Sequence, residues 1–236
     1  MTATGGHHRR IAAAVDARTQ ATRASHAYRG VLALIILAFV FSASAPNESW
    51  TRGVLLLIQS ATLATALWRS REKEVRGPLL VILAAVILAA AQIIYGGDAL
   101  TSAAATLSGL FVIVTIVVIG RGVIRKGVVD QESVIGAIGI YLLLGMLFTF
   151  AYAVLATEGA GPFFAQGTDG TAATRLYFSY TTLCTVGYGD YTAASNLGHT
   201  LAVSEALLGQ LYLVTVVALL VGRVRPRGDG SPPPAS

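Results

Sequence analysis

The sequence predicts an all-α membrane protein: six transmembrane helices, with a shorter re-entrant helix and a loop between the fifth and the sixth. Three observations lead to this prediction: the composition, a series of apolar runs, and the placement of basic residues between those runs. Of the 236 residues, 54% are hydrophobic and 12% are charged, and the mean hydropathy is +0.66. Soluble domains carry about 25% charged residues, so the composition favours the membrane class.

Six apolar runs mark the predicted spans. A spanning helix needs about 20 mostly apolar residues. The last two runs meet this length, whereas the first, second and fourth do so only if flanking polar residues are included. We expect all six to be spans, because turn or charged residues bound each run and none has the charged face of a soluble amphipathic helix. The runs are Val31–Ala45, Val54–Trp68, Leu79–Tyr95, Leu107–Gly120, Val134–Ala156 and Leu197–Val221.

Basic residues cluster in alternate connections, and the other connections hold only Arg52 and Arg175 at their margins. The positive-inside rule therefore predicts a multi-pass protein of the inner (plasma) membrane with both termini in the cytoplasm and the loop Thr157–Ala173 outside. The net charge of +5 thus reflects topology, and we expect no nucleic-acid partner. The clustered residues are Arg9, Arg10, Arg18, Arg23, Arg29, Arg69, Arg71, Lys73, Arg76, Arg121, Arg125, Lys126, Arg223, Arg225 and Arg227.

The segment Thr185–Asp190 has the sequence TVGYGD and follows Ala172–Cys184, a stretch too short to cross a bilayer but long enough to enter and stop. Irregular backbone at membrane depth survives only where it lines a cavity or coordinates something, because unpaired backbone groups in hydrocarbon are costly. Gly187 and Gly189 can take positive φ, which is needed to turn successive carbonyls toward one axis. The segment therefore predicts a ring of carbonyls offered to a dehydrated cation, that is, an ion selectivity filter.

The residues Thr181–Asp190, TTLCTVGYGD, resemble the filter sequence of the potassium channel family, in which the carbonyls of TVGYG loops replace the hydration shell of K⁺. The resemblance extends more loosely from Val134 to Val221. It implies a prokaryotic-type potassium channel that conducts K⁺ passively, with K⁺ as the permeant ion and no organic cofactor. An acidic residue in place of Tyr188 accompanies lower selectivity in such channels, so Tyr188 favours K⁺.

The resemblance also implies the roles of individual residues. It implies that Thr185, Val186, Gly187 and Tyr188 supply carbonyl oxygens to K⁺, and that Thr185 also supplies its hydroxyl. It implies that Gly189 completes the filter and that Asp190, at the outer mouth, concentrates cations.

A ring of this kind needs four loops, and the chain carries one, so we expect a C4 homotetramer in the lipid bilayer. The fifth run, Val134–Ala156, is the expected outer helix of the pore and carries Gly136, Gly139 and Gly145, small surfaces that favour close helix contact. Ordinary transmembrane composition explains these glycines equally well.

The re-entrant stretch Ala172–Cys184, the pore helix, carries the predicted support of the filter. We expect Tyr177, Phe178 and Tyr180 to pack the filter from behind and to resist its collapse around a small ion. Thr181 and Thr182 complete this support at the end of the helix.

The sixth run, Leu197–Val221, is the expected inner helix of the pore, and two of its residues stand out. Glu205 lies in an otherwise apolar stretch, where a carboxylate is costly and is usually functional or partnered. We favour an interpretation in which it braces the pore helix through Tyr180, Thr181 or Thr182; lining the cavity is the alternative, and its ionisation stays open. Gly209 lies midway along the helix, as a gating hinge or as a site of close packing.

The remaining features define the organisation and the alternatives. Leu107–Gly120 contains no arginine, so we expect no voltage sensor, which needs several charges in the membrane field. No serine–histidine–aspartate set or paired-carboxylate pattern suggests an enzyme, no soluble partner is evident, and Cys184 is expected to be inert behind the filter. The predicted segments are a cytoplasmic N-terminal segment (1–30), a four-helix transmembrane region (31–126), a pore domain (127–224) and a disordered tail (225–236).

Two other functions remain open. A non-selective cation channel uses the same architecture, and a non-conducting membrane scaffold or receptor retains the pore fold without ion flux. A transporter of the multi-loop kind carries four imperfect loops in one chain, whereas this chain has a single complete one. The sequence does not identify the gating stimulus, the direction of physiological flux or the role of the first four helices.

Overall fold

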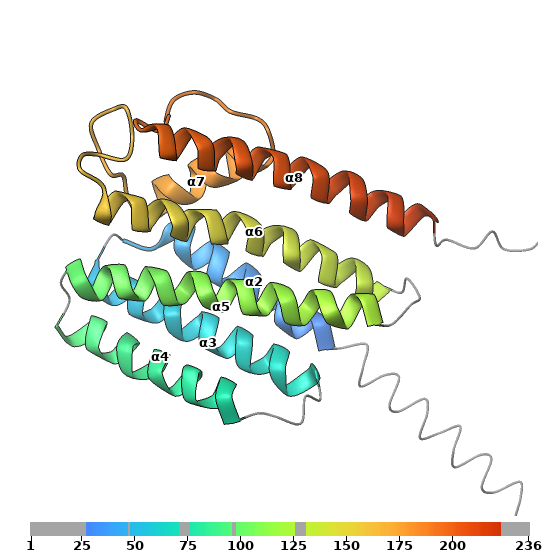
Figure 1. Ribbon diagram of the computed structural model, residues 1–236. Coiled ribbons are helices and arrows are strands. Elements are labelled where there is room, and N and C mark those ends of the chain that lie inside the picture. Colours follow the sequence, from blue (N-terminus) through green and yellow to red (C-terminus); the bar gives the residue numbers. More distant parts are fainter. Residues whose placement is uncertain (1–26, 47, 71–75, 96–97, 126–130, 223–236) are drawn as a thin grey trace, which may run out of the picture.

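The computed structural model describes residues 27–46, 48–70, 76–95, 98–125 and 131–222, and these form seven α-helices (Figure 1). The all-α prediction is confirmed for this part of the chain. Six helices coincide with the six apolar runs, each extended by a few residues, and α7 coincides with the predicted re-entrant helix. The helices are α2 (Ala27–Ser44), α3 (Ser49–Ser70), α4 (Arg76–Ile94), α5 (Asp98–Arg125), α6 (Gln131–Glu158), α7 (Ala172–Leu183) and α8 (Asn196–Gly222).

The helical lengths bear on the predicted spans. Within the described ranges, Ser102–Ile124 and Gln131–Glu158 are long and apolar enough to cross a membrane, and Tyr28–Ser44 and Ile82–Ile94 are shorter apolar helices. The count of six spans therefore stays a prediction. Residues 1–26 of the predicted N-terminal segment and the predicted tail lie outside the described residues, whereas residues 27–30 belong to α2.

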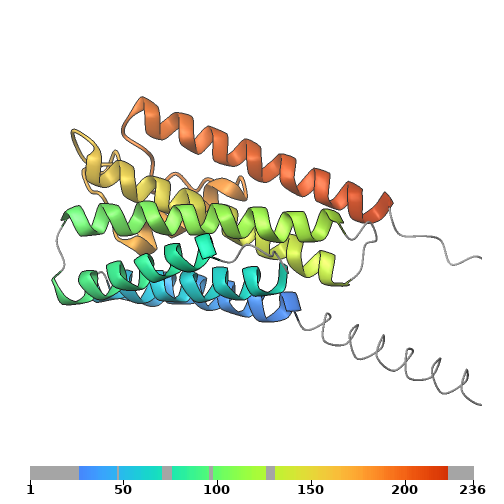
Figure 2. The ribbon, with the colours of Figure 1, turned by 60° about the horizontal axis from the view of Figure 1, so that its bottom comes forward.

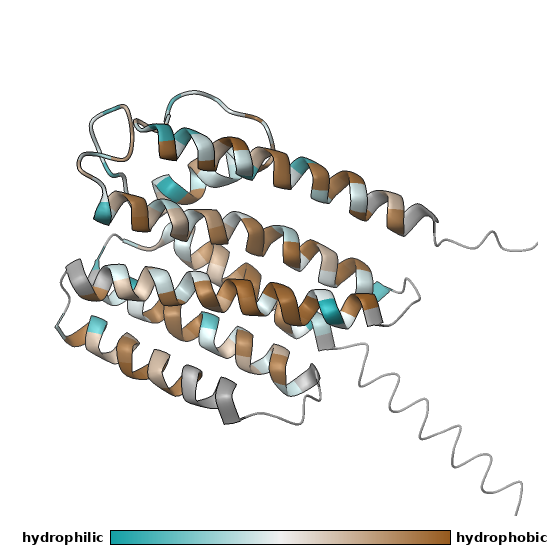
Figure 3. Ribbon diagram, viewed as in Figure 1, coloured by the Kyte–Doolittle hydropathy of each residue, from teal (hydrophilic) through white to brown (hydrophobic). Residues whose placement is uncertain are grey.

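The helices other than α7 lie side by side and run in alternating directions, and the short helix α7 runs in the same direction as α8 (Figures 1 and 2). α3 packs on α2, α4 and α5; α6 packs on α2 and α5; α7 packs on α6 and α2; and α8 packs on α6 and α7. The first four helices thus contact the last three directly, through α2 and α5. Figure 3 shows apolar residues predominating along the helices and hydrophilic residues in the loops next to α7.

The main core joins the first helices to the last ones. Its buried side chains come from α2, α3, α5, α6 and α7, so the short helix α7 is fixed in the same core as the peripheral helices. The members are Val31, Ile35, Ala38, Leu55, Ala66, Val112, Ile119, Leu143, Met146, Phe150 and Leu176.

A polar contact joins the starts of α2 and α6. The first N–H groups of a helix have no partner within the helix, and the N–H of Tyr28 donates to Oε2 of Glu132 at 3.3 Å. The Arg29 guanidinium donates to Gln131 at 3.2 Å beside it. The carboxylate of Glu132 is buried, so this contact fixes the register of the two helices.

The glycines of α6 lie where neighbouring helices approach most closely. A Cβ at Gly145 would lie 2.6 Å from Cζ of Tyr180, and one at Gly136 would lie 2.9 Å from a methyl group of Val123. A Cβ at Gly139 would lie 3.3 Å from Ile35. The structure favours close helix contact over ordinary composition for Gly145 and Gly136, and both contacts are made within one chain.

We predict that Gly145→Ala destabilises the protein by about 1–3 kcal/mol, because the added methyl group displaces the rigid ring of Tyr180. Thermal unfolding in detergent measures the effect. Gly30→Ala is the matched control, because a Cβ at Gly30 in α2 meets nothing within 4 Å. Equal melting temperatures for the two variants would show that Gly145 is not needed for the approach of α7.

Candidate ion-conducting site

The short helix α7 places the TVGYGD segment. Its N-cap is Thr171, whose side-chain oxygen accepts from the N–H of Thr174 at 3.1 Å. At the other end, the N–H of Cys184 donates to the carbonyl of Tyr180 at 3.0 Å, and the helix stops. Its C-terminal end therefore adjoins the loop and presents the negative end of the helix dipole to it.

The backbone of the loop alternates in conformation. Positive φ recurs at every second residue, with 56° at Thr185, 52° at Gly187 and 80° at Gly189. Glycine adopts this region readily, which fits the sequence-based expectation for the two glycines. Thr185 was not expected there; a non-glycine residue with positive φ is uncommon and marks a local constraint.

Hydrogen bonds from the N–H groups of the TVGYGD loop to α7 turn the loop carbonyls away from α7. The N–H groups of Val186 and Gly187 donate to the Thr181 carbonyl at 2.8 and 3.1 Å, and the N–H of Thr185 donates to Thr182 at 2.9 Å. In a trans peptide the N–H and the preceding C=O point in opposite directions. The carbonyls of Thr185 and Val186 therefore point away from α7. Thr181 and Thr182 contact the loop through their main-chain oxygens.

The loop lies on an open face of the single chain. Val186 is 52% exposed and Tyr188 is 71% exposed, and a Cβ at Gly187 or Gly189 would meet nothing within 4 Å. Helix α8 lies at the edge of the bundle (Figures 1 and 2) and exposes an apolar stripe at helical spacing. The stripe consists of Val203, Leu207, Leu211 and Val214.

Two segments pair on the outer side of the loop. The N–H of Ala165 donates to Thr192 O and that of Ala194 donates to Phe163 O, both at 2.8 Å. The Gln166 amide donates to the backbone carbonyl of Asp190 at 2.9 Å. The loop that precedes α7 therefore holds the backbone of the exposed residue Asp190 through the Gln166 side chain.

The aromatic residues of α7 correct the expectation that all three pack behind the filter. Tyr177 stacks on Tyr188, with ring centroids 6.3 Å apart and planes at 3°. Phe178 instead joins a buried aromatic cluster with Phe148, Tyr152, Phe163 and Phe164. Successive residues point about 100° apart around a helix, so neighbouring side chains cannot share one face.

Tyr180 also faces away from the filter. Its ring packs edge-on against Phe39 of α2, with centroids 4.9 Å apart, and its hydroxyl donates to the Leu142 carbonyl of α6 at 2.5 Å. Tyr180 therefore anchors the pore helix to the outer helix and to α2, and supports the loop only through α7.

Glu205 joins three helices at one buried point. Its side chain is fully buried and accepts from the Tyr152 hydroxyl of α6 and the Ser179 hydroxyl of α7, each at 2.5 Å. The Ser179 oxygen also lies 2.7 Å from the Gly145 carbonyl. The interpretation of Glu205 as a brace of the pore helix fits this geometry, whereas the expected partners Tyr180, Thr181 and Thr182 are wrong.

Gly209 lies against the end of α7. A Cβ there would lie 2.5 Å from the Leu183 carbonyl, so the geometry favours close packing, and the hinge stays a prediction. Three residues later, the Tyr212 hydroxyl donates to Ala137 O of α6 at 2.7 Å. Cys184 is exposed in the single chain and its Sγ lies 3.4 Å from the Tyr141 hydroxyl; its inertness stays a prediction.

Comparisons with known proteins agree with the filter sequence. Residues 140–225 match the ion channel family. The chain is 32% identical over 85 residues to the inward rectifier potassium channel Kirbac3.1 of Paramagnetospirillum magnetotacticum, and 35% identical over 80 residues to the probable potassium channel protein 2 of Methanocaldococcus jannaschii. No solved structure matches.

These matches cover 36% and 33% of this chain, and 27% and 20% of the length of the two relatives. The resemblance to the potassium channel family, predicted from the residues around the TVGYGD segment, is confirmed for this part of the chain. The segment that precedes residue 140 lies outside the family match.

We predict that Ser179→Ala lowers the free energy of unfolding by about 1–3 kcal/mol, because it leaves a buried carboxylate short of one donor. Denaturation of the purified protein in detergent checks this. Ser204→Ala is the matched control: the Ser204 hydroxyl donates to the Thr200 carbonyl of its own helix, at 2.8 Å, and the loss of this bond is expected to change the free energy of unfolding by less than about 0.5 kcal/mol. A Ser179→Ala effect no larger than the control would refute the bracing role.

Proposed function

We propose that four copies of this chain surround a central axis in a membrane and conduct K⁺ passively, with selectivity over Na⁺. The carbonyls of Thr185, Val186, Gly187 and Tyr188 contribute the ion sites, and Gly189 and Asp190 form the outer end. This function is consistent with the ion channel family match over residues 140–225.

The alternating backbone of the loop carries the proposal. Positive φ at Thr185, Gly187 and Gly189, with N–H groups bonded back to α7, leaves successive carbonyls directed away from the pore helix. A dehydrated cation needs several oxygens that replace its water at once. The irregular backbone has a physical justification in a membrane if it lines such a path.

Assembly accounts for the open face. One loop offers carbonyls from one side only, and a closed cyclic arrangement of identical chains completes the ring. Among the described helices, α8 packs substantially on α6 and α7 alone, so its apolar stripe is left uncovered within one chain. In the proposed tetramer this stripe contacts the neighbouring copies or the central cavity.

The surrounding residues keep the ring from collapsing. Glu205 ties the inner helix to α7 through Ser179, and Thr181 holds the loop through its carbonyl. Helices α2 to α5 form an outer layer around the pore unit, with both termini in the cytoplasm. In the hinge proposal, bending at Gly209 moves the end of α8 that carries Tyr212 away from α6.

We predict that Gly187→Ala abolishes K⁺ flux, because an alanine at positive φ is strained and the carbonyl direction changes. Flux is measured in liposomes that hold a K⁺ gradient, with Na⁺ compared in parallel. Gly161→Ala is the control, because Gly161 lies in a loop, has no positive φ and has open space around its Cβ position.

Each contrary outcome points to one alternative. Equal K⁺ and Na⁺ flux through the unaltered protein would contradict selectivity and support a non-selective cation channel. Absence of flux under every voltage, pH and lipid composition would support a scaffold that retains the pore fold.

Mixing subunits tests the shared ring separately. If one altered loop spoils a filter built from four, then co-assembly with Gly187→Ala chains reduces flux far more steeply than the fraction of altered chains. The measurement is flux against mixing ratio after co-expression and joint purification. A loss in direct proportion to that fraction would show that each chain conducts alone.

A further inference from the structure

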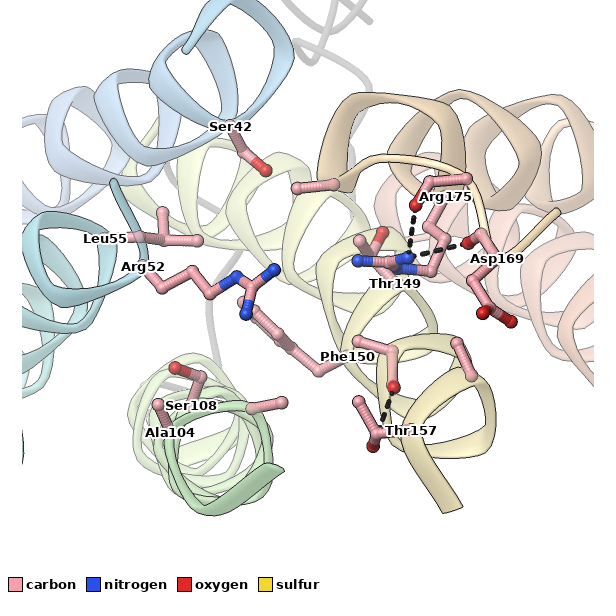
Figure 4. Close-up of a pocket in the computed structure, with 15 residues that line it drawn as sticks. Ser42, Arg52, Leu55, Ala104, Ser108, Thr149, Phe150, Thr157, Asp169 and Arg175 are labelled. Atoms are coloured by element: carbon pink, nitrogen blue, oxygen red, sulfur yellow. Dashed lines mark hydrogen bonds between the residues drawn. The ribbon is translucent and has the colours of Figure 1, made fainter. Parts of the chain in front are cut away.

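A cavity of about 450 Å³ lies between the peripheral helices and the pore unit. Ser42 of α2, Arg52 of α3 and Ser108 of α5 line one wall, and Thr149 of α6 and Arg175 of α7 line the other. Figure 4 shows the side chains of Arg52 and Arg175 extending into the same space from opposite walls. The volume is within the range of small-molecule sites, about 300–1,000 Å³.

Arg175 is buried without full hydrogen bonding. Its side chain is 8% exposed, and its Nη1 donates to the carbonyls of Asp169 and Gly170 at 2.7 and 2.9 Å. Its Nε is buried and has no hydrogen-bond partner among the described residues. A buried charged donor without an acceptor is unfavourable, so the site lacks an acceptor at this atom.

Two arginines and one carboxylate line the cavity, so its basic groups outnumber its acidic ones. Arg52 lies near enough for its charge to repel that of Arg175, and bringing two guanidinium groups together is stabilised by an anion between them. Asp169 also lines the cavity, and its negative charge attracts that of Arg175, so one carboxylate lies with the two guanidinium groups; its Oδ1 accepts from the N–H of Phe163 at 2.9 Å. Arg175 contacts its backbone carbonyl instead.

Apolar residues also line the cavity, and the cavity reaches an exposed rim. Leu55, Phe150 and Ala153 are among the apolar lining residues, and Thr157 and Asp169 at the rim are exposed. A ligand that fits both features carries an anionic group and a hydrocarbon chain. Arg52 near the start of α3 and Arg175 near the start of α7 are at the end of the bundle that the basic clusters predict to face outside.

We propose that this cavity binds a phosphate-bearing anion, with its charge between Arg52 and Arg175, and that an anionic phospholipid of the outer leaflet supplies it. The bound phosphate links α3 to the first turn of the pore helix, and the acyl chain lies along the apolar wall. The choice of an outer-leaflet lipid rests on the proposed topology. The anion site itself does not depend on ion conduction.

Thermal unfolding of the purified protein in neutral detergent tests the site without any flux measurement. Short-chain phosphatidylglycerol, phosphatidylcholine and inorganic phosphate are titrated separately. We expect a saturable rise in Tm with phosphatidylglycerol, by linkage, and a smaller one with phosphatidylcholine, whose choline cation is repelled by the two arginines. Equal shifts with the two lipids would overturn the proposal.

Arg52→Gln keeps the bonds of Arg175 intact and removes one guanidinium. We expect about a tenfold loss of apparent affinity for phosphatidylglycerol. The affinity of Arg52→Lys should fall between those of Arg52→Gln and the unaltered protein, because lysine keeps the charge and loses the planar guanidinium. Arg52→Lys also tests the site if Arg52→Gln does not fold. Arg121→Gln, at an exposed position near the other end of α5, is the matched control and should bind as the unaltered protein does.

The remaining outcomes separate the sources of the anion. An unchanged response to phosphatidylglycerol in both Arg52 variants would refute the site. A saturable shift with inorganic phosphate that Arg52→Gln removes would support the anion site with a soluble source. A response to phosphatidylglycerol alone would support the lipid.

Discussion

The chain reversal after α7 is the constraint on which the rest of the site depends. One carbonyl, that of Thr181, accepts hydrogen bonds from two consecutive loop N–H groups, at 2.8 and 3.1 Å. These bonds direct the loop N–H groups at the pore helix and the carbonyls to the opposite side. Any shift or rotation of α7 would therefore move the oxygen atoms that the proposed function uses.

Contacts from several directions hold α7 in place. Glu205 of α8 and Tyr152 of α6 meet Ser179 in one buried cluster, and Tyr180 bonds α6 on another side. Outside, the pairing of Ala165 with Thr192 closes the connection around the loop. Buried polar networks of this kind are rigid only if every member is satisfied, which is why loss of one hydroxyl is expected to matter.

Most of the helices and the conformation of the loop glycines were predictable from local sequence patterns. Long apolar runs and the residues that bound them predicted the helices, and two glycines separated by one residue predicted the alternating loop. The partners of Glu205 were not predictable, because a helix turns about 100° per residue and the sequence does not fix the rotation of α7 relative to α8. Ser179 rather than Tyr180 therefore faces Glu205.

The positive φ of Thr185 could not be predicted from the sequence, because threonine ordinarily avoids this conformation. The contacts of the loop impose it. In the sequence, Arg52 and Arg175 lie at the margins of two different connections, and nothing there indicates that they share a site. Their approach across the cavity depends on how α3 and α7 pack around α2 and α6. Local chemistry thus predicts elements, while the sites between elements require the packing.

The most direct test of the central claim is a structure of the assembled protein with Tl⁺ in place of K⁺, which locates the ion by its anomalous scattering. The account predicts four chains around one axis, with Tl⁺ bound between the carbonyl oxygens of Thr185, Val186, Gly187 and Tyr188. A monomeric particle, loops that do not share an axis, or Tl⁺ bound only elsewhere would contradict it.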